Sequence, residues 1–163
     1  MEVHSIEAIV KALNEAGVRY LVVGGLAVNA HGFVRLTRDV DIVLHLESGN
    51  ARLGLATLLQ MGYQPAIPES PEAFASAAAR ERWRVEKNMI ALKLWSDAHQ
   101  RTPVDVFIYE PFPFAAEYEK APRMEIAPGI LAPVVTLPTL LEMKRAAGRP
   151  QDGIDIEELT RIP

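Results

Sequence analysis

Short apolar runs alternate with longer amphipathic stretches along this chain of 163 residues. Four of the runs are too short for helices and are rich in β-branched or aromatic residues. This composition predicts strands at residues 20–23, 39–44, 89–95 and 103–109. Because the predicted strands are interleaved with helical patterns, we expect an α/β (α+β) fold in which a mixed β-sheet is flanked by helices.

The amphipathic stretches predict three helices in the first half of the chain. Ser5 is the expected N-cap of the first, and its apolar stripe consists of Ile6, Ile9, Val10 and Leu13. After a turn at residues 47–50, the second helix is expected to end before Gly62. Ser70 and Pro71 have the character of an N-cap and a first-turn proline for a third helix through about Arg84. We favour a short surface helix there over a mobile flap.

The last third of the chain predicts a strand or hairpin from residues 123–126 and 130–135, then a helix from Thr136 that ends at Gly148. In the final segment, capping of free helix amides explains Asp152 and Asp155 adequately. The length and the hydrophobic content of 49% favour one domain. Its core is expected at about residues 18–110, and a short C-terminal helical tail at about 136–160.

A glycine pair follows the first predicted strand. Gly24 and Gly25 break the apolar pattern before a helix at about residues 26–31, which Gly32 ends. Without Cβ atoms the backbone can approach a ligand closely, and free amides at the start of the helix can donate to phosphate oxygens. The pattern therefore predicts a place for the phosphates of a nucleotide.

Aspartates occupy alternate positions of the second predicted strand. Asp39 and Asp41 fall on one face, whereas Val40 and Ile42 fall on the other, toward a core. Two adjacent carboxylates repel each other unless a cation lies between them, and Mg2+ prefers carboxylate and phosphate oxygens. Asp105 adds a carboxylate to an otherwise apolar strand, where it is either a third metal ligand or an edge-strand residue facing water. We favour the metal ligand.

The order of these features resembles a known superfamily. A glycine pair, His-Gly, an arginine, a threonine and Asp-x-Asp-Ile succeed one another at Gly24, Gly25, His31, Gly32, Arg35, Thr37, Asp39 and Asp41. This order is similar to that of the nucleotidyltransferase superfamily, which has the polymerase-β-like fold. It most closely resembles the small bacterial members associated with abortive infection and type IV toxin-antitoxin systems. The resemblance implies two metal-binding aspartates on one strand and a third, here Asp105, on a neighbouring strand.

The resemblance continues into the C-terminal tail. Lys144, Arg149, Asp152 and Asp155 match a basic-then-Asp-x-x-Asp pattern of the same branch, in which the lysine helps to hold the nucleoside triphosphate. Longer members of the branch continue into a helical domain that helps to bind the acceptor. For this chain we therefore expect that a second copy or a protein partner completes the acceptor cleft.

Several polar residues near these motifs have alternative interpretations. The residues assigned to nucleotide binding are Gly24, Gly25, Arg35, Thr37 and Lys144. Arg35 or Lys144 would neutralise the β and γ phosphates, but a surface position or structural pairing with Asp39 explains Arg35 at least as well. For His31 and Thr37 local hydrogen bonding is favoured over catalysis. Lys93 either reaches a phosphate or extends to solvent.

The activity that the resemblance implies is transfer of a nucleoside monophosphate from a nucleoside triphosphate to an acceptor hydroxyl. Asp39 and Asp41 would hold one Mg2+, and Asp41 and Asp105 would hold a second, unless Asp105 itself acts as the base. The acceptor stays open among a transfer RNA end, a protein hydroxyl and a small molecule such as an aminoglycoside or a lincosamide. The role would be in toxin-antitoxin function, phage defence or antibiotic modification. The alternative is a non-catalytic binding module, which three retained aspartates argue against because idle like charges repel.

Composition narrows these choices. The net charge of −4, from 17 basic and 21 acidic residues, lacks the basic footprint of a protein that grips nucleic acid along its backbone. Basic residues do cluster at residues 80–87 and 144–149, which predicts either a local anion site or, more commonly, solvated helix faces. The chain has no cysteine, which excludes disulfides, thiolate zinc sites and a thiol nucleophile. No apolar run approaches the roughly 20 residues of a membrane span, and we expect a cytoplasmic protein.

Overall fold

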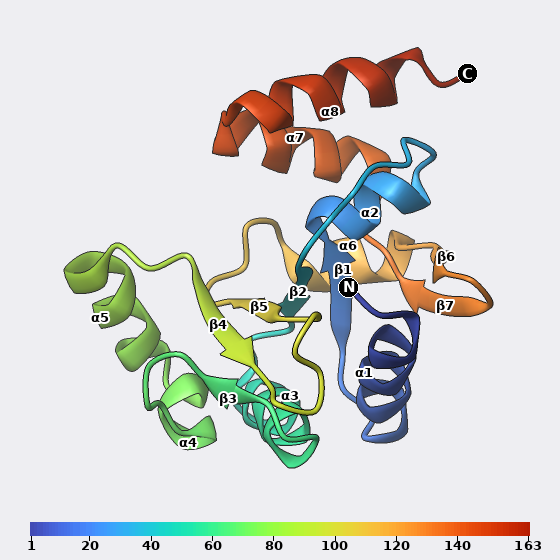
Figure 1. Cartoon of the computed structure of the whole chain (residues 1–163). Helices are drawn as coiled ribbons and strands as arrows, with labels where there is room; N and C mark the ends of the chain where they lie inside the picture. Colours follow the sequence, from blue (N-terminus) through green and yellow to red (C-terminus); the bar gives the residue numbers. More distant parts are fainter.

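The computed structural model describes the whole chain, residues 1–163, and places a five-stranded mixed sheet among helices, beside a separate two-stranded hairpin (Figure 1). The strand order in the large sheet is β1-β2-β5-β4-β3. The strands are β1 (Tyr20–Val23), β2 (Val40–Leu44), β3 (Gln64–Pro65), β4 (Ala91–Trp95), β5 (Val104–Phe107), β6 (Arg123–Ala127) and β7 (Ile130–Pro133). The helices are α1 (Val3–Glu15), α2 (Gly24–Ala30), α3 (Ser48–Gln60), α4 (Pro71–Ala75), α5 (Ala77–Lys87), α6 (Phe114–Lys120), α7 (Leu137–Ala147) and α8 (Pro150–Arg161). The predicted fold class, a mixed sheet flanked by helices, is confirmed.

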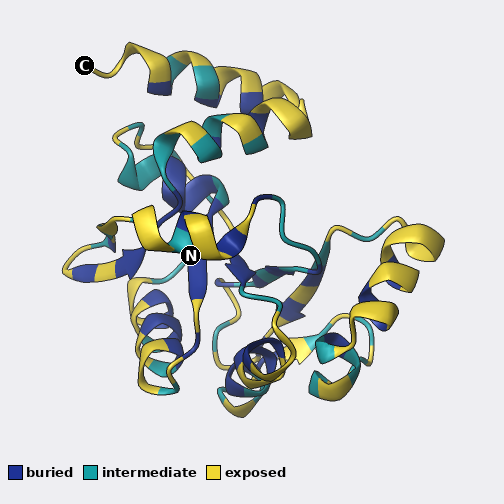
Figure 2. Ribbon diagram, turned by 180° about the vertical axis from the view of Figure 1, so that it is seen from behind, coloured by how far each residue is buried: buried dark blue, intermediate teal, exposed yellow.

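The two central strands bury one of their faces in the core. β2 and β5 are parallel to each other, and the outer neighbours of this pair, β1 and β4, are antiparallel to it. Alternate side chains of the central pair are at most 2% exposed: Val40, Ile42, Val104 and Val106. α3 packs on this face, since a Cβ added to Gly54 would lie 2.7 Å from Leu44. The buried strands and the inward helix faces are visible in Figure 2. The predicted inward-outward alternation is thus confirmed, and the residues between these positions lie on the other face of the sheet.

Two predicted helix starts are wrong in an informative way. α1 begins at Val3, and Ser5 lies within it, fully buried, with its Oγ 2.8 Å from Nδ1 of His99. Ser5 therefore holds the connection between β4 and β5 rather than capping the helix. The predicted turn at residues 47–50 is the start of α3, because the carboxylate of Glu47 accepts hydrogen bonds from the amides of Gly49 and Asn50.

The helix predicted from Pro71 to Arg84 is two helices. Ser70 caps α4 as expected, with its Oγ accepting from the amide of Ala73. Ser76 then adopts an extended conformation, with φ −78° and ψ 115°, and its Oγ accepts from the amide of Ala79 at the start of α5. A second serine cap inside an alanine-rich stretch thus redirects the chain.

The C-terminal region follows its prediction closely. The hairpin of β6 and β7 lies beside the large sheet through a bridge between Val22 and Val134. α7 ends at Gly148, whose φ of +62° suits glycine. α8 packs along α7, and this helical pair lies over α2, on the far side of the sheet from α1 and α3 (Figure 1). None of the helices is both long enough and apolar enough to span a membrane.

Candidate active site

Two of the predicted catalytic aspartates are direct neighbours in the sheet. Asp41 of β2 is paired in register with Asp105 of β5, and both side chains are partly exposed on the face opposite the core. β5 lies between β2 and β4, so the interpretation of Asp105 as an edge-strand residue is wrong. Parallel pairing places the two carboxylates side by side. Asp39 lies just before β2, two positions from Asp41 and on the same face by the strand alternation.

Asp41 is the most perturbed carboxyl of this group. Its pKa is raised to about 7, mainly by burial and also by the charges of Asp105 and Asp39, while the charges of Lys144 and Arg149 oppose the rise. Because neighbouring carboxylates repel one another around this half-buried group, a cation bound between them is strongly favoured.

The pKa of Asp41 predicts a pH dependence of stability in metal-free buffer. An unfolded aspartate titrates near 3.9, so between about pH 4 and pH 7 the unfolded chain loses a proton that the folded chain keeps. The free energy of unfolding therefore falls as pH rises through this range, by at most about 4 kcal/mol. Urea unfolding in EDTA should show that Asp41→Asn gains stability over the unchanged protein from pH 5 to pH 8. A difference that does not vary with pH would contradict the assigned electrostatics.

The glycine turn packs directly on the aspartate strand. Val23 is paired with Asp41, and Gly24 follows with φ +64° at the first position of α2. A Cβ added to Gly24 would lie 2.1 Å from Oδ2 of Asp41, and one added to Gly25 would lie 2.2 Å from Oγ1 of Thr37. Only glycine leaves room at both positions. The predicted phosphate turn and the predicted metal strand thus form one site, although the helix begins at Gly24 rather than two residues later.

The donor atoms of the site suit a hard cation, but three ligands are not gathered. No group of three or more His, Asp or Glu side chains is arranged to hold a metal ion. Oδ2 of Asp105 instead accepts a hydrogen bond of 3.0 Å from Nζ of Lys93, whose side chain is 68% exposed. The carboxylate oxygens of Asp41 and Asp105 are of the kind that Mg2+ prefers. The three-aspartate metal site stays a prediction, and Lys93 has a partner that neither predicted role included.

Arg35 and Lys144 are engaged in a buried ionic cluster. Arg35 binds Asp155 in bidentate fashion, with Nε to Oδ1 at 2.6 Å and Nη2 to Oδ2 at 2.8 Å. Nζ of Lys144 lies 2.8 Å from Oδ2 of Asp155 and 3.0 Å from Oδ1 of Asp152. Asp152 also caps α8 by accepting from the amide of Arg149. The proposed pairing of Arg35 with Asp39 is therefore replaced by an ion pair to α8.

Asp155 is the centre of this cluster. It is fully buried, which raises its pKa, but hydrogen bonds from Arg35, Lys144 and Gln151 outweigh burial and lower the pKa to about 2. Capping explains Asp152, as predicted, and does not explain Asp155. The cluster joins α7 and α8 to the loop of residues 33–39, which carries Thr37 and leads into the aspartate strand.

His31 has a structural hydrogen bond. Its Nε2 lies 2.8 Å from the carbonyl oxygen of Val135, which ties the end of α2 to the segment after β7. The sequence predicts a hydrogen-bonding role for His31, although the partner is 104 residues away rather than local.

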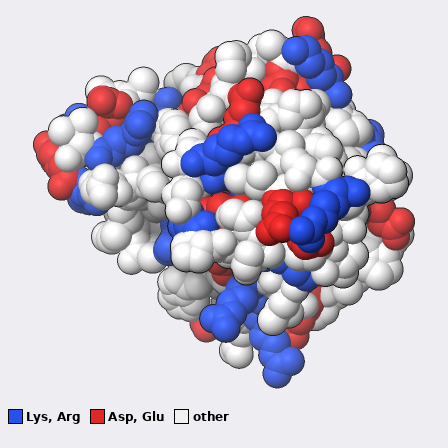
Figure 3. Space-filling model, turned by 90° about the horizontal axis from the view of Figure 1, so that it is seen from above, with Lys and Arg blue, Asp and Glu red and all other residues white.

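Seen from the side of α7 and α8, basic and acidic side chains are interspersed and neither sign forms a continuous stripe (Figure 3).

Comparison with known proteins identifies the fold. A scan against models of protein families finds no match, and no curated protein matches the chain in sequence. The structure is similar to that of the lincosamide antibiotic adenylyltransferase LnuA with lincomycin bound. The TM-score is 0.67 at 14% identity, over 100% of this chain and 99% of LnuA.

Two structures of the protein ANT(2″)-Ia are also similar. ANT(2″)-Ia in complex with adenylyl-2″-tobramycin has a TM-score of 0.61 at 15% identity, over 96% of this chain and 86% of that one. The solution structure of the antibiotic-resistance factor ANT(2″)-Ia has a TM-score of 0.56 at 17% identity, over 94% and 79%. At such low identities the likeness establishes the fold, and the predicted nucleotidyltransferase fold is confirmed. The closer resemblance to the abortive-infection branch stays a prediction.

Proposed function

We propose that this chain is a nucleotidyltransferase, which moves a nucleoside monophosphate from a nucleoside triphosphate to a hydroxyl group of an acceptor. The observation that carries the proposal is the pairing of Asp41 with Asp105 on adjacent parallel strands, with Gly24 packed against Asp41. Acidic groups and a glycine turn then meet where a triphosphate and an acceptor hydroxyl can approach each other. The fold shared with two antibiotic adenylyltransferases supports the same activity.

The proposed roles follow from the contacts. Mg2+, held by Asp39 and Asp41, would neutralise the negative charge that develops on the phosphoryl oxygens. The acceptor oxygen forms a bond to the α-phosphorus as the bond from that phosphorus to the pyrophosphate oxygen breaks. In this proposal Asp105 takes the hydroxyl proton, and Lys93, which donates to its Oδ2, holds the carboxylate in place.

The nucleotide would be positioned mainly by backbone. Gly24 and Gly25 leave space beside Asp41 and Thr37, so the triphosphate can lie against the start of α2. Arg35 and Lys144 lie near this place but have their charges balanced by Asp155 and Asp152. We therefore assign them first to holding α7 and α8 against the loop of residues 33–39. They would contribute to charge neutralisation through the electrostatic field of the cluster.

For the acceptor we propose a small hydroxyl-bearing molecule. The match to LnuA covers 99% of that protein, so this chain spans the length of a protein solved with lincomycin bound. The net charge of −4 also disfavours an RNA acceptor that is gripped along its backbone. Transfer to RNA or to a protein would instead indicate the toxin-antitoxin or phage-defence role.

A labelling assay tests both the activity and the acceptor. The protein is incubated with each nucleoside triphosphate, labelled at the α-phosphorus, together with lincomycin, tobramycin, bulk transfer RNA or a protein extract. We expect label on a small-molecule acceptor with Mg2+ present, and none after chelation with EDTA. Label on RNA or protein would keep the activity and overturn the small-molecule acceptor. Absence of both label transfer and pyrophosphate release in all mixtures would contradict the enzyme and favour the binding module.

A further inference from the structure

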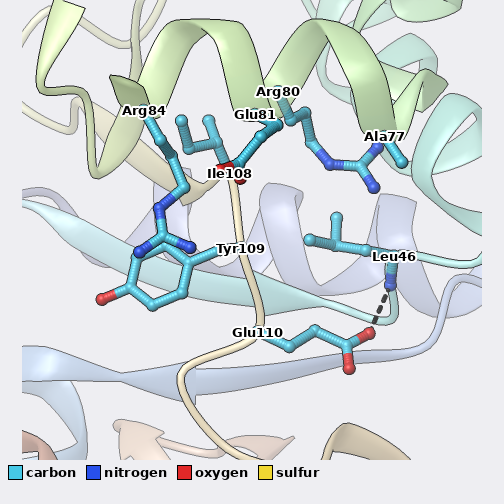
Figure 4. Close-up of a pocket in the computed structure, with 8 residues that line it drawn as sticks. All are labelled: Leu46, Ala77, Arg80, Glu81, Arg84, Ile108, Tyr109 and Glu110. Atoms are coloured by element: carbon cyan, nitrogen blue, oxygen red, sulfur yellow. Dashed lines mark hydrogen bonds between the residues drawn. The ribbon is translucent and has the colours of Figure 1, made fainter.

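A charged pocket lies at the opposite end of β5 from the paired aspartates. It is open to solvent and has a volume of about 360 Å3. It is lined by α5, by Leu46, which lies two residues after β2, and by the segment that follows β5 (Figure 4). Arg80, Glu81 and Arg84 reach it from α5, and Tyr109 and Glu110 from the other side. The proposed reaction uses none of these residues.

Arg80 is a buried cation without a carboxylate partner. Only 7% of the residue is exposed, yet no carboxylate oxygen lies within 4.0 Å of its guanidinium nitrogens. Nη1 donates to the carbonyl oxygen of Phe74, which leaves most of its five N–H donors unused by the protein. Burial accordingly lowers the pKa of Arg80. The nitrogens of Arg80 that have no partner in the protein are not fully buried, so their N–H donors reach solvent at the pocket and are available to an anion.

Arg84 adds a second unpaired cation to the same pocket. Its guanidinium carbon lies 4.2 Å from the centre of the Tyr109 ring, so the plane of the group is supported by stacking while its N–H edge stays available. No carboxylate lies within 4.0 Å of Arg84 either. Residues 80 and 84 are four positions apart on α5, which places both side chains on one face of the helix.

The pocket also contains two glutamates, Glu81 and Glu110, which can accept hydrogen bonds from a ligand. Glu110 lies near enough to raise the pKa of Arg80 by its charge, but one of its oxygens, Oε1, accepts from the amide of Leu46 at 2.8 Å. Neither Glu81 nor Glu110 has a basic side chain within 4.0 Å. The pocket thus holds separated charges of both signs. It suits a ligand whose anionic group meets the arginines and whose N–H or O–H donors meet a glutamate.

The pocket is distinct from the paired aspartates. Tyr109 lies four residues beyond Asp105, which is roughly 13 Å at the rise of an extended strand. The Phe107 ring lies between them along the chain, with its centre 5.9 Å from that of Tyr109. We propose that this pocket is a second ligand site, which takes a small molecule bearing a phosphate or carboxylate group with a hydrogen-bond donor beside it. This site goes beyond the proposed nucleotidyl transfer and does not depend on it.

Titration of the intact protein with inorganic phosphate, and separately with acetate, tests the site. Amide shifts of 15N-labelled protein are followed for α5 and residues 108–110. We expect saturable shifts there and a loss of affinity of about tenfold or more in Arg84→Gln, an exposed position where the fold should tolerate the change. Arg82→Gln, on the same helix but outside the pocket, is the matched control and should bind normally. Glu81→Gln removes a repelling charge and should tighten binding.

The outcomes separate this site from the nucleotide site. Phosphate binding that is lost in Arg84→Gln and persists in the presence of Mg2+ and adenosine triphosphate supports the proposal. A stronger response to phosphate than to acetate assigns a phosphate ligand, and the reverse assigns a carboxylate. No shifts in α5 at tens of millimolar of either anion, equal binding by Arg84→Gln and Arg82→Gln, or displacement by the nucleotide would overturn the second site. Failure of the labelling assay would leave these binding results unchanged.

Discussion

Nucleotidyl transfer is expected to fall by about a thousandfold in Asp41→Asn, while the fold stays intact. Asparagine has the shape of aspartate but no negative charge, so the Gly24 contact at the site is kept and the cation-binding carboxylate is lost. The loss should appear in kcat more than in KM if Asp41 acts mainly on the transition state. Initial rates of pyrophosphate release at several concentrations of nucleotide measure both parameters.

Asp97→Asn is a matched control for this substitution. Asp97 is exposed in the connection between β4 and β5, and it forms no ion pair. Its replacement should leave both transfer and stability unchanged within about 0.5 kcal/mol. Transfer by Asp41→Asn at a rate close to that of Asp97→Asn would remove Asp41 from the mechanism and, with it, the proposed site.

The parts of the site that depend on local pattern could be predicted from the sequence. β1 has the bounds that its apolar run predicted, Tyr20–Val23, and the alternation in the next strand placed Asp39 and Asp41 opposite Val40 and Ile42. These patterns reflect the two-residue period of a strand, which neighbouring residues determine. That Asp105 would pair with Asp41 followed from the superfamily resemblance rather than from the pattern. The residue pattern of one strand does not show which other strand lies beside it in the sheet.

The ionic cluster could not be predicted in the same way. Arg35 and Asp155 are 120 positions apart, and their contact depends on how α8 packs against the loop of residues 33–39. In the sequence Asp155 follows the capping Asp152 by three positions, a spacing that a second acid in the first turn of a helix explains without any distant partner. The contact of Lys93 with Asp105 did have a signal in the sequence. The strands that carry them, β4 and β5, are predicted as an antiparallel pair, and in that pair Lys93 and Asp105 lie opposite each other.

The arginine-rich helix illustrates how three-dimensional context divides a sequence cluster. Arg80, Arg82, Arg84 and Lys87 predict either an anion site or a solvated face. In the structure Arg80 is buried, Arg84 stacks on Tyr109, and Arg82 is exposed. The solvated face therefore describes Arg82, and the anion site stays a proposal for Arg80 and Arg84. The spacing of four residues between positions 80 and 84 was the signal that these two belong together.

Replacing Asp155 with asparagine is expected to destabilise the fold by about 3 kcal/mol or more. The carboxylate is fully buried and is shared by Arg35 and Lys144, and Lys144 is itself only 5% exposed. Without it, two cations remain close together in a region that Asp152 alone must balance. Urea unfolding at pH 7 measures the loss. Glu157→Gln, which breaks an exposed pair with Arg161 on the same helix, should cost less than about 1 kcal/mol.

The pH dependence of this difference identifies its origin. Because the pKa of Asp155 is about 2 in the folded protein and near 3.9 in an unfolded chain, its ionised form stabilises the fold above about pH 4. That stabilisation is lost as pH falls toward 2, so the gap between the unchanged protein and Asp155→Asn should narrow over this range. A gap of the same size at pH 7 and pH 3 would indicate lost packing rather than lost charge. Full stability of Asp155→Asn would show that α8 is held against the loop of residues 33–39 by other contacts, such as buried Leu159.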